Sequence, residues 1–324
     1  MKISQRNYNY DLIRIFACFL VVLFHCNQQV PVIGVLTMPC NSLFFMVSGA
    51  LLLPTSLSGV DFYKRRLSKV LFPTLFFTLF YLTRDAMIGT IDWKTFLHYI
   101  AEIPFIPQGH VVLWFMYALL GLYIIAPILS SWIKDASRRE LEIILILWFV
   151  SCLLPVISKG KLTSEHHESL YYYVGGYIGY FLLGYYLKTY CQNVKQLISL
   201  LLIIVSVSVQ YIYNKYCNLE NLSPITVFVS IGWFLFFQSL HFDKIRFSKR
   251  SKKTLVWVSS CCFGIYFIHC FIKGFCQIYI QQLINDNVSM TLMLAFITFI
   301  ISLLLCLLIS LLPFAQYIIG YKHK

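Results

Sequence analysis

The chain has 324 residues, of which 59% are hydrophobic and 12% charged, and its mean hydropathy is +0.74. This composition excludes a soluble domain, a disordered regulator and a nucleic-acid-binding protein, and it is typical of an integral membrane protein. The eleven cysteines are too few for a disulfide-stapled secreted domain, and lysine and arginine in the loops on one side of a bilayer explain the net charge of +13.

Ten apolar segments approach the roughly 20 residues that a helix needs to cross a bilayer. Only helices and closed barrels satisfy every backbone group in lipid, and these segments are too long for barrel strands. We therefore expect an all-α polytopic membrane protein with one integral-membrane domain over residues 1–324. In chain order, the predicted spans are 10–26, 32–53, 67–88, 111–133, 141–157, 170–187, 197–213, 224–240, 255–272 and 290–317.

The distribution of positive charge predicts the orientation of these spans. With a cytoplasmic amino terminus, the inner loops and ends hold 19 lysines and arginines, the outer loops hold six, and Arg14 lies inside the first span. This asymmetry predicts that both termini are cytoplasmic. The first segment is expected to be a span and not a cleaved signal, because it contains charged residues and no small-residue cleavage site follows it.

Three ionisable side chains lie in the first predicted span, where they are usually paired or functional. Asp11 and Arg14 are three residues apart, a spacing that allows an ion pair on one helix face. Arg14 and His25 are separated by eleven residues, which places them within about 20° of each other and roughly 16 Å apart along the helix axis. The alternative is that Arg14 extends to the inner interface while His25 caps the outer end of the helix.

A second histidine, His269, lies near the outer end of the ninth predicted span. Odd-numbered spans all run outwards, so His25 and His269 are expected at a similar depth. Two imidazoles that meet in a dry cavity suit proton transfer near neutral pH. A lone histidine on an apolar helix is otherwise more often a structural hydrogen-bonding group.

Two further segments have both a structural and a functional interpretation. The loop containing Lys64, Arg65 and Arg66 fits positive-inside charge, but arginine pairs also bind phosphates by bidentate hydrogen bonds. Polar and small residues at 39–49 interrupt the second span, which favours close helix packing over an unwound segment that lines a cavity.

Two sets of potential metal ligands are given structural interpretations. The loop at 165–168 holds adjacent histidines, which suit a solvated loop better than a metal site. No cysteines form a C-x-x-C pair, and those within apolar spans are expected to pack as small hydrophobic residues, namely Cys18, Cys152, Cys261, Cys262 and Cys306. No metal is expected.

Several short motifs occur together in a consistent order. Arginine and histidine frame ten residues in the first span, Phe44 to Gly49 reads Phe-Phe-Met-Val-Ser-Gly with Ser48 inside it, and a basic pair follows at Arg65 and Arg66. A Leu-Trp-Phe segment contains Trp114, and a late Tyr-x-x-His joins Tyr266 to His269. With these motifs the chain resembles the membrane-bound acyltransferase 3 family over most of its length.

One position departs from the family pattern. Members of this family often carry histidine two residues before the tryptophan, where this chain has Val112. His110 is close by in the sequence.

The resemblance implies transfer of an acyl group, usually acetyl, from acetyl-CoA or another cytoplasmic acyl-CoA to a hydroxyl group of a cell-surface or lipid-linked carbohydrate. It implies a bacterial cytoplasmic membrane location, with the lipid bilayer, acyl-CoA and a glycan acceptor as partners, and no nucleic acid.

Under this interpretation, His25 acts as the general base, Arg14 positions the donor and Asp11 orients Arg14. Lys64, Arg65 and Arg66 bind the phosphates of coenzyme A. His269 and Tyr266 line the pocket or stabilise the oxyanion, and Ser48 and Trp114 support the site. The competing hypothesis is a proton-coupled transporter or flippase for a lipid-linked sugar or small solute, in which Asp11, Arg14 and His25 relay protons.

Overall fold

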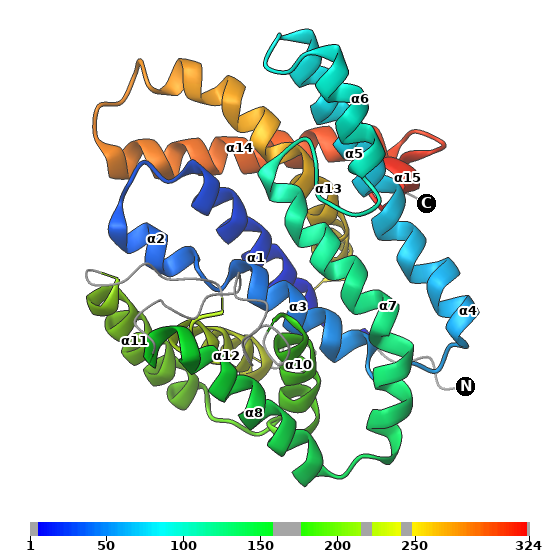
Figure 1. Ribbon diagram of the computed structural model, residues 1–324. Helices are drawn as coiled ribbons and strands as arrows, with labels where there is room; N and C mark the ends of the chain where they lie inside the picture. The colour runs from blue at the N-terminus through cyan, green and yellow to red at the C-terminus, as the bar shows by residue number, and fades with distance from the viewer. Residues whose placement is uncertain (1–5, 158–175, 215–221, 241–247, 323–324) are drawn as a thin grey trace.

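The structure is a computed structural model that describes residues 6–157, 176–214, 222–240 and 248–322, and these residues form helices and connecting turns with no strand (Figure 1). The prediction of an all-α fold is thereby confirmed. The elements are α1 (Tyr8–Cys26), α2 (Pro31–Thr37), α3 (Cys40–Leu52), α4 (Gly59–Phe62), the π-helical η1 (Tyr63–Leu67), α5 (Ser68–Met87), α6 (Trp93–Glu102), the 3₁₀ turn η2 (Val111–Leu113), α7 (Trp114–Asp135), α8 (Arg138–Ile157), α10 (Ile178–Tyr190), α11 (Gln196–Tyr213), α12 (Pro224–Ser239), α13 (Lys249–Ile280), α14 (Asn287–Ser310) and α15 (Ala315–Ile318).

Six helical segments in the described part of the chain are long and apolar enough to cross a membrane, which supports the polytopic fold. They are α1, α2 with α3 (Pro31–Leu52), α7, α11, α13 and α14. The other predicted spans correspond to α5, α8, α10 and α12. Charged residues and a proline make α5 less apolar, and α8 begins with charged residues. Helices α10 and α12 have 13 and 16 residues in the described range.

The observed helices differ from the predicted spans at two places near the carboxyl end. Helix α13 has 32 residues and a length of roughly 48 Å, so it extends beyond the predicted 255–272 span at both ends. Helix α14 ends at Ser310 and not at 317, because Pro313 cannot continue the backbone hydrogen bonding of a helix.

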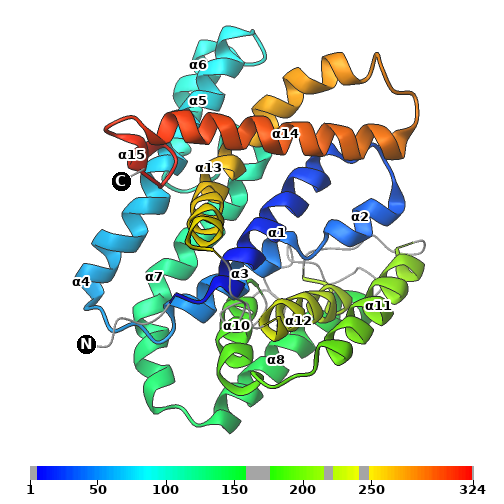
Figure 2. The same cartoon turned by 180° about the vertical axis from the view of Figure 1, so that it is seen from behind.

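Helix α1 lies at the centre of the bundle and packs against α2, α3, α12, α13 and α14 (Figures 1 and 2). Its amino terminus is capped by the Asn7 side chain, which accepts a hydrogen bond from the backbone N–H of Asn9 at 2.9 Å. Because α1 contacts so many neighbours, the residues on several of its faces are buried, and its polar side chains must find partners or cavities inside the protein.

The interruption of the second predicted span is a junction between α2 and α3 at Met38 and Pro39. Immediately beyond it, α3 packs closely against α10 through two glycines. A Cβ on Gly49 would collide with the backbone carbonyl of Phe181, and a Cβ on Gly184 would collide with that of Met46. The prediction that this segment serves close helix packing is confirmed for Gly49.

The two ends of helix α1 lie in regions of different chemical character. We call the end where α1 begins, with Arg6, Arg14, Arg65 and Arg66, the basic end. We call the region where α1 ends, with His25 and His269, the histidine end.

Candidate active site

Among the described residues, three cavities that share Arg66 open at the basic end, with volumes of about 660, 580 and 310 Å³. A further cavity of about 1080 Å³ at this end is lined by Arg6 and Lys69. The 660 Å³ cavity is bordered by Lys64, Arg65 and Arg66 from η1, the residues that the sequence predicts to bind phosphates. Asp11 is the one acidic residue among the described residues that line these cavities. The cavities therefore present a strongly positive surface that favours an anionic ligand.

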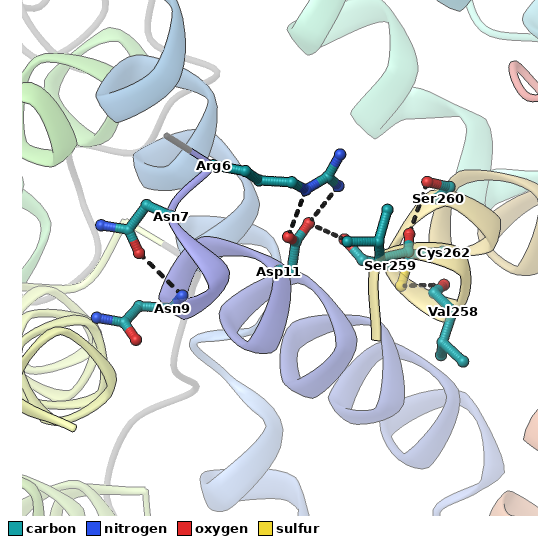
Figure 3. Close-up of polar contacts among 9 residues, drawn as sticks. Arg6, Asn7, Asn9, Asp11, Val258, Ser259, Ser260 and Cys262 are labelled. Carbon is teal, nitrogen blue, oxygen red and sulfur yellow. Dashed lines mark hydrogen bonds and ion pairs between the residues drawn. The ribbon is translucent and has the colours of Figure 1, made fainter. Parts of the chain in front are cut away.

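The predicted ion pair between Asp11 and Arg14 is wrong. The Asp11 carboxylate accepts two hydrogen bonds of 2.8 Å from Arg6 and one of 2.7 Å from the Ser259 hydroxyl (Figure 3). Arg6 precedes the helix, so its side chain can reach back and offer two parallel N–H groups to the carboxylate. The hydrogen bond to Asp11 raises the pKa of Arg6 above its ordinary value.

Arg14 consequently has no hydrogen-bond or ion-pair partner within the described residues, although it is half-buried on the central helix. It lines both the 580 and the 310 Å³ cavities, together with Ser48 from α3. A half-buried guanidinium without a counter-ion is costly unless a ligand supplies the negative charge. The position of Arg14 therefore supports the expectation of an anion-binding residue.

The smallest of the three cavities that share Arg66 is lined by residues of the basic end and by residues of α7 and α13. Its lining includes Arg14, Arg66, Phe115 and Tyr266. Tyr266 is three residues before His269 on α13, about one helical turn away. This partly apolar cavity, called the passage below, therefore extends from cationic side chains to Tyr266, one helical turn from His269.

The structure brings the two predicted histidines together, although they come from α1 and α13. The ring centroids of His25 and His269 are 5.1 Å apart. His269 is fully buried, and its Nδ1 lies 2.6 Å from the carbonyl oxygen of Tyr266. That carbonyl can only accept, so Nδ1 carries the proton and Nε2 presents its lone pair.

Tyr266 and Trp114 fix the surroundings of the histidine pair. The Tyr266 hydroxyl donates a 2.7 Å hydrogen bond to the carbonyl of Val112, which ties α13 to the start of α7. The Trp114 ring packs against Tyr177, with 5.3 Å between the centroids. The proton of the Tyr266 hydroxyl is therefore already used, while its ring lines the passage.

His110, which lies between α6 and η2 in the chain, is beside the histidine end. Its ring packs against Tyr81 with 4.9 Å between the centroids, and it is close enough to interact electrostatically with His25 and His269. Burial, followed by the charge of Arg84, lowers the pKa of His110 below its ordinary value. His110 thus occupies the neighbourhood of the missing histidine at 112 without being placed by the same motif.

Three residues near the histidines were not identified from the sequence as site residues. Lys273 interacts electrostatically with His25, and Arg84 does so with His110. The Sγ atom of Cys270 lies 3.3 Å from Nε2 of His269. Cys270 directly follows His269 in the chain, and this adjacency was the one available signal.

The remaining sequence predictions have simple outcomes. The five cysteines expected to pack as small hydrophobic residues are all buried and unpaired. The loop at 165–168 lies outside the described residues.

In comparison with known protein families, residues 7–311 match a family described as an acyltransferase domain. Comparison with curated proteins and with solved structures gives no match. The family match includes both ends of the bundle, from Arg14 to His269.

Proposed function

We propose that this chain, which belongs to the acyltransferase 3 family of membrane acyltransferases, moves an acetyl or other short acyl group from acyl-CoA to a carbohydrate hydroxyl group. The observation that carries this proposal is the passage that extends from Arg14, which has no partner among the described residues, to Tyr266, one turn from His269. An elongated donor with an anionic head and a reactive tail matches this shape.

The donor enters from the basic end, which faces the cytoplasm because most lysines and arginines lie on that side. Arg65, Arg66 and Lys64 bind the nucleotide phosphates, and Arg14 binds a phosphate deeper in the passage. The pantetheine arm follows the passage past Ser48 and Phe115, which places the thioester near the histidines. Asp11 acts on this site indirectly, by fixing Arg6 and Ser259.

At the histidine end, His25 takes the proton from the acceptor hydroxyl while that oxygen attacks the thioester carbonyl. A carbon–oxygen bond forms, the carbon–sulfur bond breaks, and the proton on His25 passes to the departing thiolate of coenzyme A. His269, whose Nδ1–H is held by the Tyr266 carbonyl, keeps a neutral imidazole beside His25. Tyr266 and Trp114 position the histidines and the start of α7.

The acceptor is a cell-surface or lipid-linked glycan that approaches from the opposite side of a bacterial cytoplasmic membrane. The family membership favours this reaction over the proton-coupled transporter, which the number of spans alone would also suit. The transporter hypothesis assigns Asp11, Arg14 and His25 to a proton relay, whereas the Asp11 carboxylate is hydrogen-bonded to Arg6 and Ser259.

The test is a transfer assay with the purified chain in lipid nanodiscs. Radiolabelled acetyl-CoA and succinyl-CoA are supplied separately, with lipid-linked glycans extracted from bacterial membranes as acceptors. The proposal expects label on the glycan fraction and release of one free thiol for each acyl group transferred. Intact, folded protein that neither binds coenzyme A nor consumes either thioester would refute it.

A further inference from the structure

We propose that His25, His269 and Cys270 form a Zn²⁺-binding site, and that zinc bound there blocks the proposed acyl transfer by occupying His25. The ligand atoms of these three residues all lie within 4.8 Å of one another. The metal binding is independent of the acyl-transfer reaction, whereas the inhibition rests on the proposed function.

The spacing is close to that of a tetrahedral zinc site. With Zn–N near 2.0 Å and Zn–S near 2.3 Å, neighbouring ligand atoms are about 3.3–3.6 Å apart. The Cys270 Sγ and His269 Nε2 atoms are already 3.3 Å apart. The other separations must shorten by at most about 1.5 Å, a range covered by side-chain rotation of His25 and Cys270, which are both half-buried.

The surroundings of His269 prepare it as a ligand. Its Nδ1–H donates to the carbonyl oxygen of Tyr266 at 2.6 Å, so the lone pair of Nε2 points toward Cys270. Histidine ligands of zinc commonly donate their second ring N–H to a backbone carbonyl or a carboxylate, which fixes both tautomer and ring orientation. This feature is present because α13 carries His269 and its acceptor one turn apart.

The chemistry of the three ligands selects the metal. Two imidazoles and one thiolate suit Zn²⁺, whereas Mg²⁺ and Ca²⁺ prefer oxygen ligands, and the cluster contains no carboxylate. On binding, the Cys270 thiol loses its proton to the buffer, and the resulting thiolate offsets part of the charge of the metal. Three protein ligands leave a fourth position for water. A lone pair of His25 that binds zinc is no longer available as a base.

The binding test uses Co²⁺ alone as a spectroscopic probe, on chelator-treated protein in nanodiscs with a purification tag that lacks histidine. We expect one cobalt per chain, a thiolate-to-cobalt charge-transfer band, and loss of that band when Zn²⁺ is added. Cys270→Ser should abolish the band. Cys276→Ser, which removes another half-buried thiol of α13, should retain it. No band in the wild type, or the same band in Cys270→Ser, would overturn the proposal.

The inhibition test measures acyl transfer with increasing Zn²⁺, and each variant is compared with its own metal-free rate. We expect wild-type transfer to fall and to recover with chelator, and half-inhibition of Cys270→Ser to need at least about tenfold more zinc. Cobalt binding by a chain that transfers no acyl group would refute the proposed function and leave the metal site intact. Transfer by a chain that binds no cobalt would refute the metal site alone.

Discussion

Replacement of Arg14 by Gln tests whether its guanidinium group binds the acyl donor. Arg14 lines two cavities and has no partner among the described residues, so its loss should leave no buried carboxylate unpaired. A hydrogen bond to a charged group contributes about 1.5–3 kcal/mol, so the Kd for coenzyme A should rise roughly 10- to 150-fold. The unfolding temperature should change by less than about 2 °C.

Titration calorimetry with coenzyme A and thermal unfolding of the same nanodisc samples provide the two measurements. Lys134→Gln is the control, because Lys134 lies near the end of α7 and lines none of the three cavities. Titration with 3′-dephospho-coenzyme A then identifies the phosphate that Arg14 binds. An unchanged Kd in Arg14→Gln would refute this assignment, and a large loss of stability would show that Arg14 serves the fold.

Three other predictions concern stability and are checked by thermal or denaturant unfolding. Asp11→Asn removes charge-assisted bonds from a carboxylate that is 2% exposed, so it should lower the free energy of unfolding by about 1–3 kcal/mol, and an unchanged value would contradict the ion pair with Arg6. Gly49→Ala should lower the free energy of unfolding by about 3 kcal/mol or more, because the added Cβ collides with a backbone carbonyl of α10. Gly121→Ala should change it by less than about 1 kcal/mol, because the space around Gly121 is open. Equal effects of the two substitutions would refute the packing of Gly49 against α10. Folding lowers the pKa of His110, so as the pH falls His110 is protonated in the unfolded chain before it is protonated in the folded protein. The free energy of unfolding should therefore decrease below about pH 6.5, and His110→Gln should lessen that decrease. The same dependence on pH in the wild type and in His110→Gln would contradict this prediction.

The sequence predicted which residues gather at the candidate site better than it predicted which side chains bond to one another. Helical periodicity placed Arg14 and His25 on one stripe, and the alternation of spans placed His25 and His269 at a similar depth, where their rings do meet. The pairing of Asp11 could not be predicted from spacing on one helix, because the competing Arg6 precedes that helix and Ser259 comes from α13.

The sequence also did not predict which helices contact each other closely. The small residues around Gly49 indicated packing, but its neighbour on α10 depends on the tertiary fold. Cys270 was missed for a similar reason, since a cysteine on an apolar helix is usually a small hydrophobic residue and only the position of the His269 ring distinguishes it.

The central claim is tested most directly by the rate of acyl transfer from labelled acetyl-CoA in His25→Asn, measured beside its Kd for coenzyme A. Loss of a general base should lower the rate by roughly 10²- to 10⁴-fold, while the Kd stays unchanged because the cationic cavities lie at the other end of the passage. A His25→Asn protein that transfers acyl groups at the wild-type rate would contradict the account.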